Sequence, residues 1–347
     1  MTSRRVALSR LVLSILFALT ALPEGARGVA GQDAATTGPA PVSFDAFLDG
    51  IRTEALARGI REETLDAVLA GLTPEPVVVS RDRSQPETVQ SLDAYLAERV
   101  SAQRIATGRQ MLERHRASLD RVKDRYGVPP QVVVAIWGLE SNFGRFTGTY
   151  STIRALATLA YDARRELFRT ELFHALTMVD RGVQPADMKG SWAGAMGQPQ
   201  FMPSSFLRHA VDLDEDGRID IWSSPADVFG SMGNYLRSAG WVDGERWGRE
   251  VQVSRAVLDR IDRQVPMRST GCRAVRDLSE PRPLPAWQEL GVRLTTGQPL
   301  PVSTLDASLV RGVRRFFLVY RNYHALIDYN CSNAYALSAG LLADRIF

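Results

Sequence analysis

Apolar residues recur at three- and four-residue spacing in the part of the chain that follows residue 43. Two such stripes open it: Phe44, Phe47, Ile51 and Leu56, and then Leu65, Val68 and Leu69. Because an α-helix turns once in about 3.6 residues, this spacing gathers the apolar side chains on one face. The pattern predicts two short amphipathic helices at the start of the fold.

Helical patterns continue through the middle of the chain. Residues 92–126 are rich in Arg and Glu and run up to Gly127, with Pro129 and Pro130 behind it, which predicts one long helix that ends there. Residues 130–248 keep helical spacing, interrupted by Gly-rich turns. We therefore expect a mainly α protein.

The last third of the chain changes character twice. Residues 251–305 contain scattered Val, Pro, Gly and Thr with weak alternation, which predicts a small β lobe. Helical spacing then returns at two places: at Leu309, Val313, Phe316 and Phe317, and from Tyr335 to Leu342. We expect C-terminal helices that pack back on the core.

These patterns divide the chain into six segments. They are a signal peptide (1–30), a flexible linker (31–42), an N-terminal helical lobe (43–125), a helical core with an acidic loop (126–250), a small β lobe (251–308) and C-terminal helices (309–347). The linker assignment follows from small residues and Pro with no large apolar side chain in that stretch.

The N-terminus has the features of an export signal. Arg4, Arg5 and Arg10 flank an apolar run over residues 11–22, which is too short to span a bilayer, and small residues follow it. An uncleaved anchor is the alternative. No Cys follows the run, so lipid attachment at a Cys is not available. We expect a protein without a stable membrane anchor.

Composition narrows the functional class. The 347 residues are 45% hydrophobic and 23% charged, as in ordinary globular proteins, and the net charge is +3 with a pI near 9.0. No Lys/Arg cluster interleaved with aromatic residues is present, which argues against nucleic-acid binding. In an exported protein, Cys272 and Cys331 are expected to form a disulfide, with two buried free thiols as the alternative.

A single acid stands at the end of an apolar run. Residues 131–139 carry no charge, and Glu140 shares a helix face with Val133, Ile136 and Trp137. Burial raises the pKa of a carboxyl toward neutrality, which keeps a glutamic acid protonated for general acid catalysis. The structural alternative is a carboxyl that caps the helix or pairs with a core Arg.

A second segment, residues 189–205, combines Gly with aromatic and amide side chains. Gly190, Gly194 and Gly197 allow close approach to the backbone, and the other side chains of interest are Ser191, Trp192, Gln198, Gln200, Phe201 and Met202. Flat apolar surfaces and neutral hydrogen-bonding groups suit an uncharged polysaccharide. A tight helix-packing corner would have the same composition.

Together, these two segments resemble the lytic murein transglycosylase B family. The similar stretches are Ile-Trp-Gly-Leu-Glu-Ser-Asn-Phe-Gly at 136–144 and Gly-Ser-Trp-Ala-Gly-Ala-Met-Gly-x-x-Gln-Phe-Met-Pro-Ser-Ser at 190–205. Further similar stretches extend over nearly the whole chain after the linker: 82–87, 155–162, 234–236, 329–330 and 335–344. The resemblance implies a lysozyme-like helical core with an additional helical lobe.

The resemblance also implies the chemistry. Glu140 would protonate the glycosidic oxygen between N-acetylmuramic acid and N-acetylglucosamine and then act as base on the muramoyl C6 hydroxyl, giving a 1,6-anhydro end without water. No cofactor would be required. Ordinary glycosidases use two carboxylates, and neither signature segment contains a second one. A hydrolytic muramidase and a noncatalytic peptidoglycan-binding scaffold protein remain alternatives.

By the same resemblance, several residues match positions that hold the glycan strand: Ser191, Gln200, Tyr235, Tyr329 and Asn330. Arg164 and Arg165 match a basic pair that could meet the carboxylates of peptide stems, although surface Arg residues on a charged helix would look the same. The resemblance implies peptidoglycan strands as the binding partner and cell-wall synthesis proteins as further candidate partners. We expect a periplasmic monomer.

An acidic loop follows the EF-hand pattern. Asp212, Asp214, Asp216 and Asp220 occupy positions 1, 3, 5 and 9, Gly217 occupies position 6, and Arg218 stands at position 7, where a backbone carbonyl binds. Ser223 replaces the bidentate Glu of position 12. The family counterpart of Asp227 closes a longer metal loop, although Asp227 could instead cap a helix. We predict a structural Ca²⁺, with a solvated Asp-rich turn as the alternative.

Overall fold

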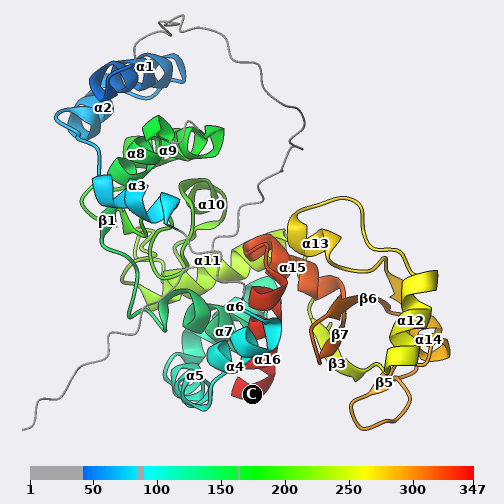
Figure 1. Ribbon diagram of the computed structural model, residues 1–347. Coiled ribbons are helices and arrows are strands. Elements are labelled where there is room, and N and C mark those ends of the chain that lie inside the picture. The colour runs from blue at the N-terminus through cyan, green and yellow to red at the C-terminus, as the bar shows by residue number, and fades with distance from the viewer. Residues whose placement is uncertain (1–41, 85–89, 163–164) are drawn as a thin grey trace, which may run out of the picture.

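The computed structural model describes residues 42–84, 90–162 and 165–347. The expected signal peptide and all of the expected linker but Val42 lie outside these residues. Three hydrophobic cores organise the described chain, two within helical lobes and one within a lobe built on a β-sheet (Figure 1). No helix in these ranges combines the length and the apolar content needed to cross a bilayer.

The first helical lobe combines the start of the chain with a later segment. Its helices are α1 (Phe44–Ala57), α2 (Glu62–Leu69), α3 (Pro76–Arg83), α8 (Thr152–Asp162), α9 (Glu166–Asp180) and α10 (Pro203–His209). α1 and α2 form where the apolar spacing predicts helices. The inward face of α1 carries Phe44, Leu48, Ile51 and Ala55, whereas Leu56 of the expected stripe is exposed. A short antiparallel pair joins β1 (Tyr150–Ser151) to β2 (Lys189–Gly190).

The second helical lobe surrounds the helix that carries Glu140. Its helices are α4 (Leu92–Arg99), α5 (Ala102–Arg114), α6 (Arg116–Tyr126), α7 (Pro130–Ser141), α11 (Pro225–Ser238), α15 (Arg321–Tyr329) and α16 (Asn333–Ile346). α16 packs against α7, α5 and α4, so the end of the chain closes this lobe. α7 is buried along nearly its whole length, which explains its uncharged sequence.

The prediction of one helix over residues 92–126 is wrong. The stretch forms three helices, because the chain turns at Ser101 and again at His115. The Ser101 hydroxyl accepts a hydrogen bond from the backbone N–H of Arg104, the standard start of a new helix. Gly127 does end the last of the three, in the left-handed conformation that glycine adopts at no steric cost.

The third lobe contains a five-stranded antiparallel sheet. Its elements are β3 (Gly248–Gln252), α12 (Arg255–Gln264), α13 (Arg273–Arg276), β4 (Arg282–Pro283), α14 (Leu284–Glu289), β5 (Arg293–Leu294), β6 (Asp306–Arg311) and β7 (Phe316–Val319). The strand order is β4-β6-β7-β3-β5 (Figure 1). The lobe carries helices as well as strands, and Trp287 of α14 fills its core.

The prediction of a helix at residues 309–317 is also wrong. β6 and β7 form a hairpin there, with Leu309 opposite Leu318, and its turn is closed by a hydrogen bond from the Gly312 N–H to the Arg315 carbonyl. The spacing of the four apolar residues at 309, 313, 316 and 317 is compatible with a helix and also with two paired strands. The turn at Gly312 makes the segment a hairpin. The sheet lobe therefore extends past residue 308, and the C-terminal helices begin at α15.

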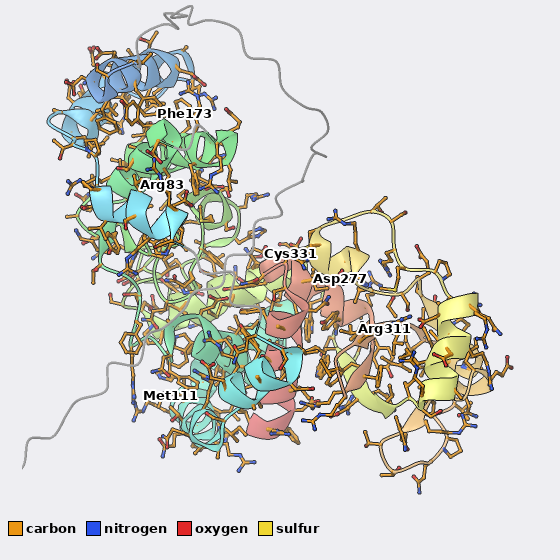
Figure 2. The ribbon with its side chains drawn as sticks, viewed as in Figure 1. Arg83, Met111, Phe173, Asp277, Arg311 and Cys331 are labelled. Atoms are coloured by element: carbon orange, nitrogen blue, oxygen red, sulfur yellow. A yellow bond between two sulfur atoms is a disulfide. The ribbon has the colours of Figure 1, made fainter. Side chains whose placement is uncertain are left out.

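A disulfide fastens the sheet lobe to the second helical lobe. Cys272, directly before α13, is bonded to Cys331, which follows α15. Figure 2 shows Cys331 near Asp277, the residue that follows α13. The bridge is one of the two alternatives that the sequence left open.

Candidate active site

Glu140 lies in the last turn of α7 with only 6% of its surface exposed. Burial raises its pKa from 4.5 to about 7, although the nearby Tyr335 phenol and the charge of Arg99 oppose that rise. Proton exchange at neutral pH is what a general acid and base requires. The apolar stripe of α7 is the physical origin of the raised pKa, as the sequence predicts.

The backbone bends sharply just after Glu140. Asn142 and Phe143 both adopt positive φ angles, of 51° and 59°, although neither is glycine. The bend folds the Phe143 ring back on Gly138, where a Cβ atom would lie 2.7 Å from the ring. Such strained residues persist only where the surrounding packing fixes them, and they are common at functional sites.

Gln198 joins α7 to the glycine-rich segment. Its Oε1 accepts a 2.8 Å hydrogen bond from the Trp137 indole, and its Nε2 donates at 2.8 Å to the Trp222 carbonyl. Its side chain also fills the space beside Gly144, where a Cβ would lie 2.5 Å from Oε1. The two signature segments are therefore in direct contact, one turn of helix away from Glu140.

The glycines of this segment meet protein atoms. A Cβ on Gly194 would lie 2.6 Å from Leu156, and one on Gly197 would lie 2.6 Å from the Ile221 carbonyl. Both glycines have positive φ. Other parts of the protein, and not a ligand, therefore approach the backbone at these two glycines. This agrees with the alternative that the segment is a tight helix-packing corner.

Aromatic rings connect this corner to Glu140. The Tyr235 and Tyr329 rings lie 4.8 Å apart, Phe201 lies 5.6 Å from Tyr235, and Tyr329 is stacked at 6.5 Å on Tyr335. The phenol of Tyr235 donates to the Asp328 carbonyl at 2.8 Å. The pKa of Tyr335 and of Tyr329 is raised, first by burial and then by the charge of Glu140, so both phenols lie near the acid.

Tyr329 also holds the glycine-rich corner. Its phenol donates a 2.8 Å hydrogen bond to the carbonyl of Pro199, next to Gln200. Gln200 has a positive φ of 53° and donates from Nε2 to the carbonyls of Gly197 and Thr147. Three segments distant in sequence therefore meet at this corner, and Tyr329 links it to Glu140.

The other residues that the sequence predicts for the site have local contacts that do not involve Glu140. The Ser191 hydroxyl accepts from the Ala195 N–H at 3.1 Å, Met202 precedes α10 and packs against the first lobe, and Asn330 follows Tyr329 at the end of α15. Arg165 forms an ion pair with Asp82. Arg164 lies outside the described residues.

The side chain of Arg165 lines a cavity that does not include Glu140. It lines a cavity of about 300 Å³ together with Phe47, Tyr161, Glu166 and Arg169, at the junction of α1, α8 and α9. Its guanidinium lies 4.7 Å from the centre of the Phe168 ring. The structure therefore places Arg165 in the first helical lobe, in an ion pair.

Sequence analysis missed two residues of α4. The buried Arg99 lowers the pKa of Glu140, and its guanidinium lies 5.2 Å from the centre of the Tyr95 ring. The pKa of Tyr95 is raised by burial, with Glu140 contributing. One signal was available, because Arg99 continues the apolar stripe of Leu92 and Leu96 and a charge on such a stripe marks an unusual environment.

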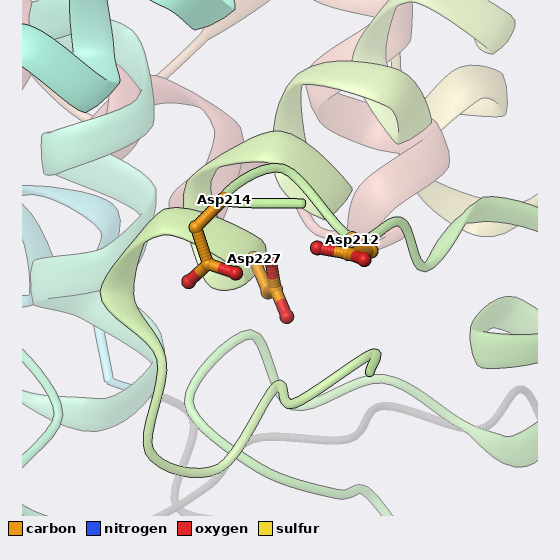
Figure 3. Close-up of side chains that lie close together, drawn as sticks. All are labelled: Asp212, Asp214 and Asp227. Carbon is orange, nitrogen blue, oxygen red and sulfur yellow. The ribbon is translucent and has the colours of Figure 1, made fainter. Parts of the chain in front are cut away.

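The acidic loop brings three carboxylates together. Oxygens of Asp212, Asp214 and Asp227 lie within 4.8 Å of one another (Figure 3). Asp227 is buried in the first turn of α11 and accepts from the N–H groups of Leu213 and Asp220 at 2.7 and 2.8 Å. Its pKa is raised by burial and by the charge of Asp214.

Two other expected carboxylate ligands, Asp216 and Asp220, are not members of this cluster of three. Asp216 accepts from the N–H of Arg218, and Asp220 accepts from the N–H groups of Trp222 and Ser223. The helix cap at this point is Ser224, whose hydroxyl accepts from the Asp227 N–H. Asp227 therefore closes the loop, and hard carboxylate oxygens in such a cluster fit the preference of Ca²⁺.

The mainly helical architecture and the buried acid at the end of a core helix place the protein in the lysozyme-like class. Residues 43–344 match the family model described as the transglycosylase SLT domain. The chain therefore belongs to the transglycosylase SLT family.

Individual relatives agree with this assignment. The chain is 35% identical over 236 residues to membrane-bound lytic murein transglycosylase B of Escherichia coli, a match that covers 66% of this chain and 60% of that protein. SltB3 of Pseudomonas aeruginosa, solved with NAG-NAM-pentapeptide, has 42% identity and a TM-score of 0.78 and covers 87% of this chain and 79% of its own. SltB3 has also been solved with NAG-anhNAM-pentapeptide.

A third relative has been solved with a metal ion. The lytic transglycosylase Slt35 of Escherichia coli, solved in complex with calcium, is 28% identical to this chain with a TM-score of 0.69. The match covers 86% of this chain and 92% of Slt35. These relatives share the lysozyme-like helical fold with this chain.

Proposed function

We propose that the protein is a peptidoglycan lytic transglycosylase that cleaves the bond from N-acetylmuramic acid to N-acetylglucosamine and leaves a 1,6-anhydromuramoyl end. The single observation that carries the proposal is the buried carboxyl of Glu140, with its pKa raised to about 7. Such a group holds its proton in the resting enzyme and can take one back later in the cycle.

The reaction uses one carboxyl twice. Protonated Glu140 donates its proton to the glycosidic oxygen while the bond from C1 of the muramoyl ring to that oxygen breaks, and N-acetylglucosamine leaves as an alcohol. The Glu140 carboxylate then removes the proton from the muramoyl C6 hydroxyl, whose oxygen bonds to C1. The proton count of the enzyme is restored, and no water is consumed.

The surroundings of Glu140 support one carboxyl acting alone. In the described part of the chain, the groups that shift its pKa besides burial are Tyr335 and Arg99, and neither is an acid. Arg99 stabilises the carboxylate after proton donation, whereas burial favours the acid before it. Opposed influences of this kind keep the pKa near neutrality.

The two complexes of SltB3 support the choice of product. That relative has been captured with NAG-NAM-pentapeptide and with NAG-anhNAM-pentapeptide, which differ in the anhydro ring. In this chain the tyrosines of α15 and α16 lie beside Glu140, the residue to which we assign the chemistry.

Mass spectrometry of fragments released from purified peptidoglycan tests the proposal. We expect anhydromuramoyl ends, lighter by one water than reducing ends, from the wild-type protein and none from Glu140→Gln. Reducing muramic ends would show a hydrolytic muramidase. Binding without release of fragments by the wild type would show a noncatalytic scaffold.

We further propose that the acidic loop binds Ca²⁺ in a structural role through Asp212, Asp214 and Asp227. The clustered carboxylates support it, and the calcium complex of Slt35 shows the ion in that relative. A bound cation would offset the mutual repulsion of these acids and hold the loop on α11. It supplies no step of the glycosidic chemistry.

Finally, we propose that the protein acts in the periplasm, where its substrate lies. The apolar run after Arg10 and the disulfide support export, because disulfides form in oxidising compartments. Cell fractionation with a C-terminal tag tests this, and retention of the protein in the cytoplasm would contradict it.

A further inference from the structure

The short linker between α15 and α16 has an aromatic neighbour of Glu140 at each end. Tyr329 is the last residue of α15, Tyr335 lies in the first turn of α16, and residues 330–332 separate the two helices. The two rings are stacked, with 7° between their planes and 6.5 Å between their centres. The conformation of this linker therefore determines how both phenols lie against Glu140.

The phenol of Tyr335 does not fix its own position. Its oxygen is buried and makes no hydrogen bond of standard geometry among the described residues, whereas the Tyr329 phenol donates to the Pro199 carbonyl at 2.8 Å. The Tyr335 phenol nevertheless lies close enough to Glu140 to lower the pKa of that acid. A small displacement of the first turn of α16 would change this contact, because no other hydrogen bond holds the phenol in place.

Two bonds attach the linker to a loop of the sheet lobe, residues 267–279, which contains α13. Cys272 of the loop is bonded to Cys331 in the middle of the linker (Figure 2). The carbonyl of Ala274 in α13 accepts a 2.9 Å hydrogen bond from Nδ2 of Asn333, the first residue of α16. The two bonds hold the linker from the side of the sheet lobe, directly before the turn that carries the second tyrosine.

Asn333 connects three helices. Besides its bond to Ala274 of α13, its Oδ1 accepts a 3.0 Å hydrogen bond from the phenol of Tyr323, a fully buried residue of α15. Next to it, the Ser332 hydroxyl accepts from the N–H of Tyr335 at 3.3 Å and so caps α16. The backbone that carries Tyr335 is therefore fixed by α13, by α15 and by its own cap.

The 267–279 loop is itself held at its base. Met267 and Ser279 pair as an antiparallel bridge there. Ser279 donates from its N–H to the Leu309 carbonyl at 3.2 Å, and its hydroxyl accepts from the Leu309 N–H at 2.7 Å, which attaches the loop to β6. Leu278 is fully buried in the hydrophobic core of the second helical lobe. The loop is thus a firm connection between the sheet and the linker.

We propose that the Cys272–Cys331 bridge and Asn333 are positioning residues, which hold Tyr329 and Tyr335 against the acid of the active site. This role rests on the proposed function, since it assumes that the acid performs the chemistry. A displacement of about 1 Å in such a site can lower a rate about a hundredfold. The rest of α16 packs on α7, α5 and α4, so loss of these bonds should leave the fold intact and loosen only the first turn.

Titration of the Glu140 carboxyl tests the proposal. Carbon-13 NMR of protein labelled at glutamate follows it, and the signal is assigned by its absence from Glu140→Gln. Cys272 is exposed, so tris(2-carboxyethyl)phosphine can reach and reduce the bridge. After reduction we expect the pKa of Glu140 to rise from about 7 by about 0.5 to 1 pH unit, because Tyr335 no longer stabilises the carboxylate. Burial and the charge of Arg99, which also act on this pKa, do not depend on the bridge.

Matched variants separate the bridge from side effects of the reductant. The double variant Cys272→Ser plus Cys331→Ser should titrate like the reduced wild type and should not respond to the reductant. Asn333→Ala, with the bridge intact, should raise the pKa in the same direction. Arg260→Met removes a hydrogen bond to the Leu290 carbonyl elsewhere in the sheet lobe and should leave the titration unchanged.

The release of fragments from peptidoglycan should also fall, about tenfold or more, in the reduced protein and in the double variant. An unchanged pKa of Glu140 in both the reduced and the Asn333→Ala proteins would overturn the proposal. Loss of the helical circular dichroism on reduction would overturn it as well, because the bridge would then maintain the whole fold. Failure of the proposed function would appear as missing fragments from the wild-type protein, and the titration does not depend on turnover.

Discussion

The indole of Trp137 and the amide of Gln198 share a buried hydrogen bond of 2.8 Å that joins the catalytic helix to the glycine-rich segment. Gln198 is 7% exposed and also binds the Trp222 carbonyl. One side chain therefore satisfies polar groups on two segments of the site.

Replacing this amide should weaken the fold and the site together. Gln198→Ala leaves the Trp137 donor and the Trp222 carbonyl unpaired, and we expect a loss of about 2–3 kcal/mol in the free energy of unfolding. Urea denaturation measures it, with the exposed Gln298→Ala as the control. A loss no greater than that of the control would show that water replaces both bonds without cost.

The raised pKa of Glu140 should make stability depend on pH. Between about 4.5 and 7 the folded state keeps a proton that the unfolded chain has lost, so this carboxyl costs stability as pH rises, by about 3 kcal/mol in all. Glu140→Gln removes that dependence. Its unfolding free energy relative to wild type should therefore increase by about this amount from pH 4 to pH 8.

Denaturation at both pH values checks this, with Glu289→Gln, an exposed acid of α14, as the control. A constant difference between Glu140→Gln and wild type at the two pH values would mean that Glu140 ionises normally in the folded state.

Arg99 should set the alkaline limit of activity. Its charge lowers the pKa of Glu140, so Arg99→Met, which keeps an unbranched apolar stem and removes the charge, should shift the alkaline limb of the pH–rate profile upward. Turbidity loss of peptidoglycan from pH 5 to pH 9 measures it, beside Arg109→Met on the exposed face of α5. An unshifted limb would assign Arg99 a packing role only.

The acidic loop should respond to calcium through Asp214. Wild-type protein should unfold at a higher temperature in calcium, by the equivalent of about 2.7 kcal/mol at a hundredfold excess over Kd. Asp214→Asn should lose this shift and, without calcium, be the more stable protein, because the Asp214 charge repels Asp227.

Differential scanning calorimetry with calcium and with a chelator provides the measurement. Glu215→Gln, in the same loop but paired with Arg121, is the control and should keep the calcium shift. A full shift in Asp214→Asn would place the ion elsewhere.

The spacing of apolar residues along the sequence predicted several helices and the burial of Glu140. α1, α2 and α16 have the expected positions, and Glu140 is buried because its helix is apolar. The hairpin of β6 and β7 was mistaken for a helix, because a few apolar residues satisfy both periods and only the pairing of the strands decides.

The site shows the same limit. Tyr95 and Arg99 reach Glu140 only because α4 packs near α7 in the folded chain, and no spacing along the sequence encodes that contact. Likewise, EF-hand spacing predicted Asp216 and Asp220 as ligands, whereas the cluster of three carboxylates consists of Asp212, Asp214 and Asp227. Asp212, Asp216 and Asp220 all accept hydrogen bonds from backbone N–H groups of the loop. Backbone donors within a loop compete for the same oxygens as a metal.

The bridge between Cys272 and Cys331 closes residues 272–331 into a covalent ring, which contains β4, β5, β6 and β7 of the sheet lobe. The fully exposed Val302 lies on a loop of that ring. A protease that cuts there would nick the chain without separating its pieces, and the fragment with Glu140 would remain tethered to the one with Tyr335. Cleavage in this loop would release the two fragments from their covalent link only after a reductant had broken the disulfide.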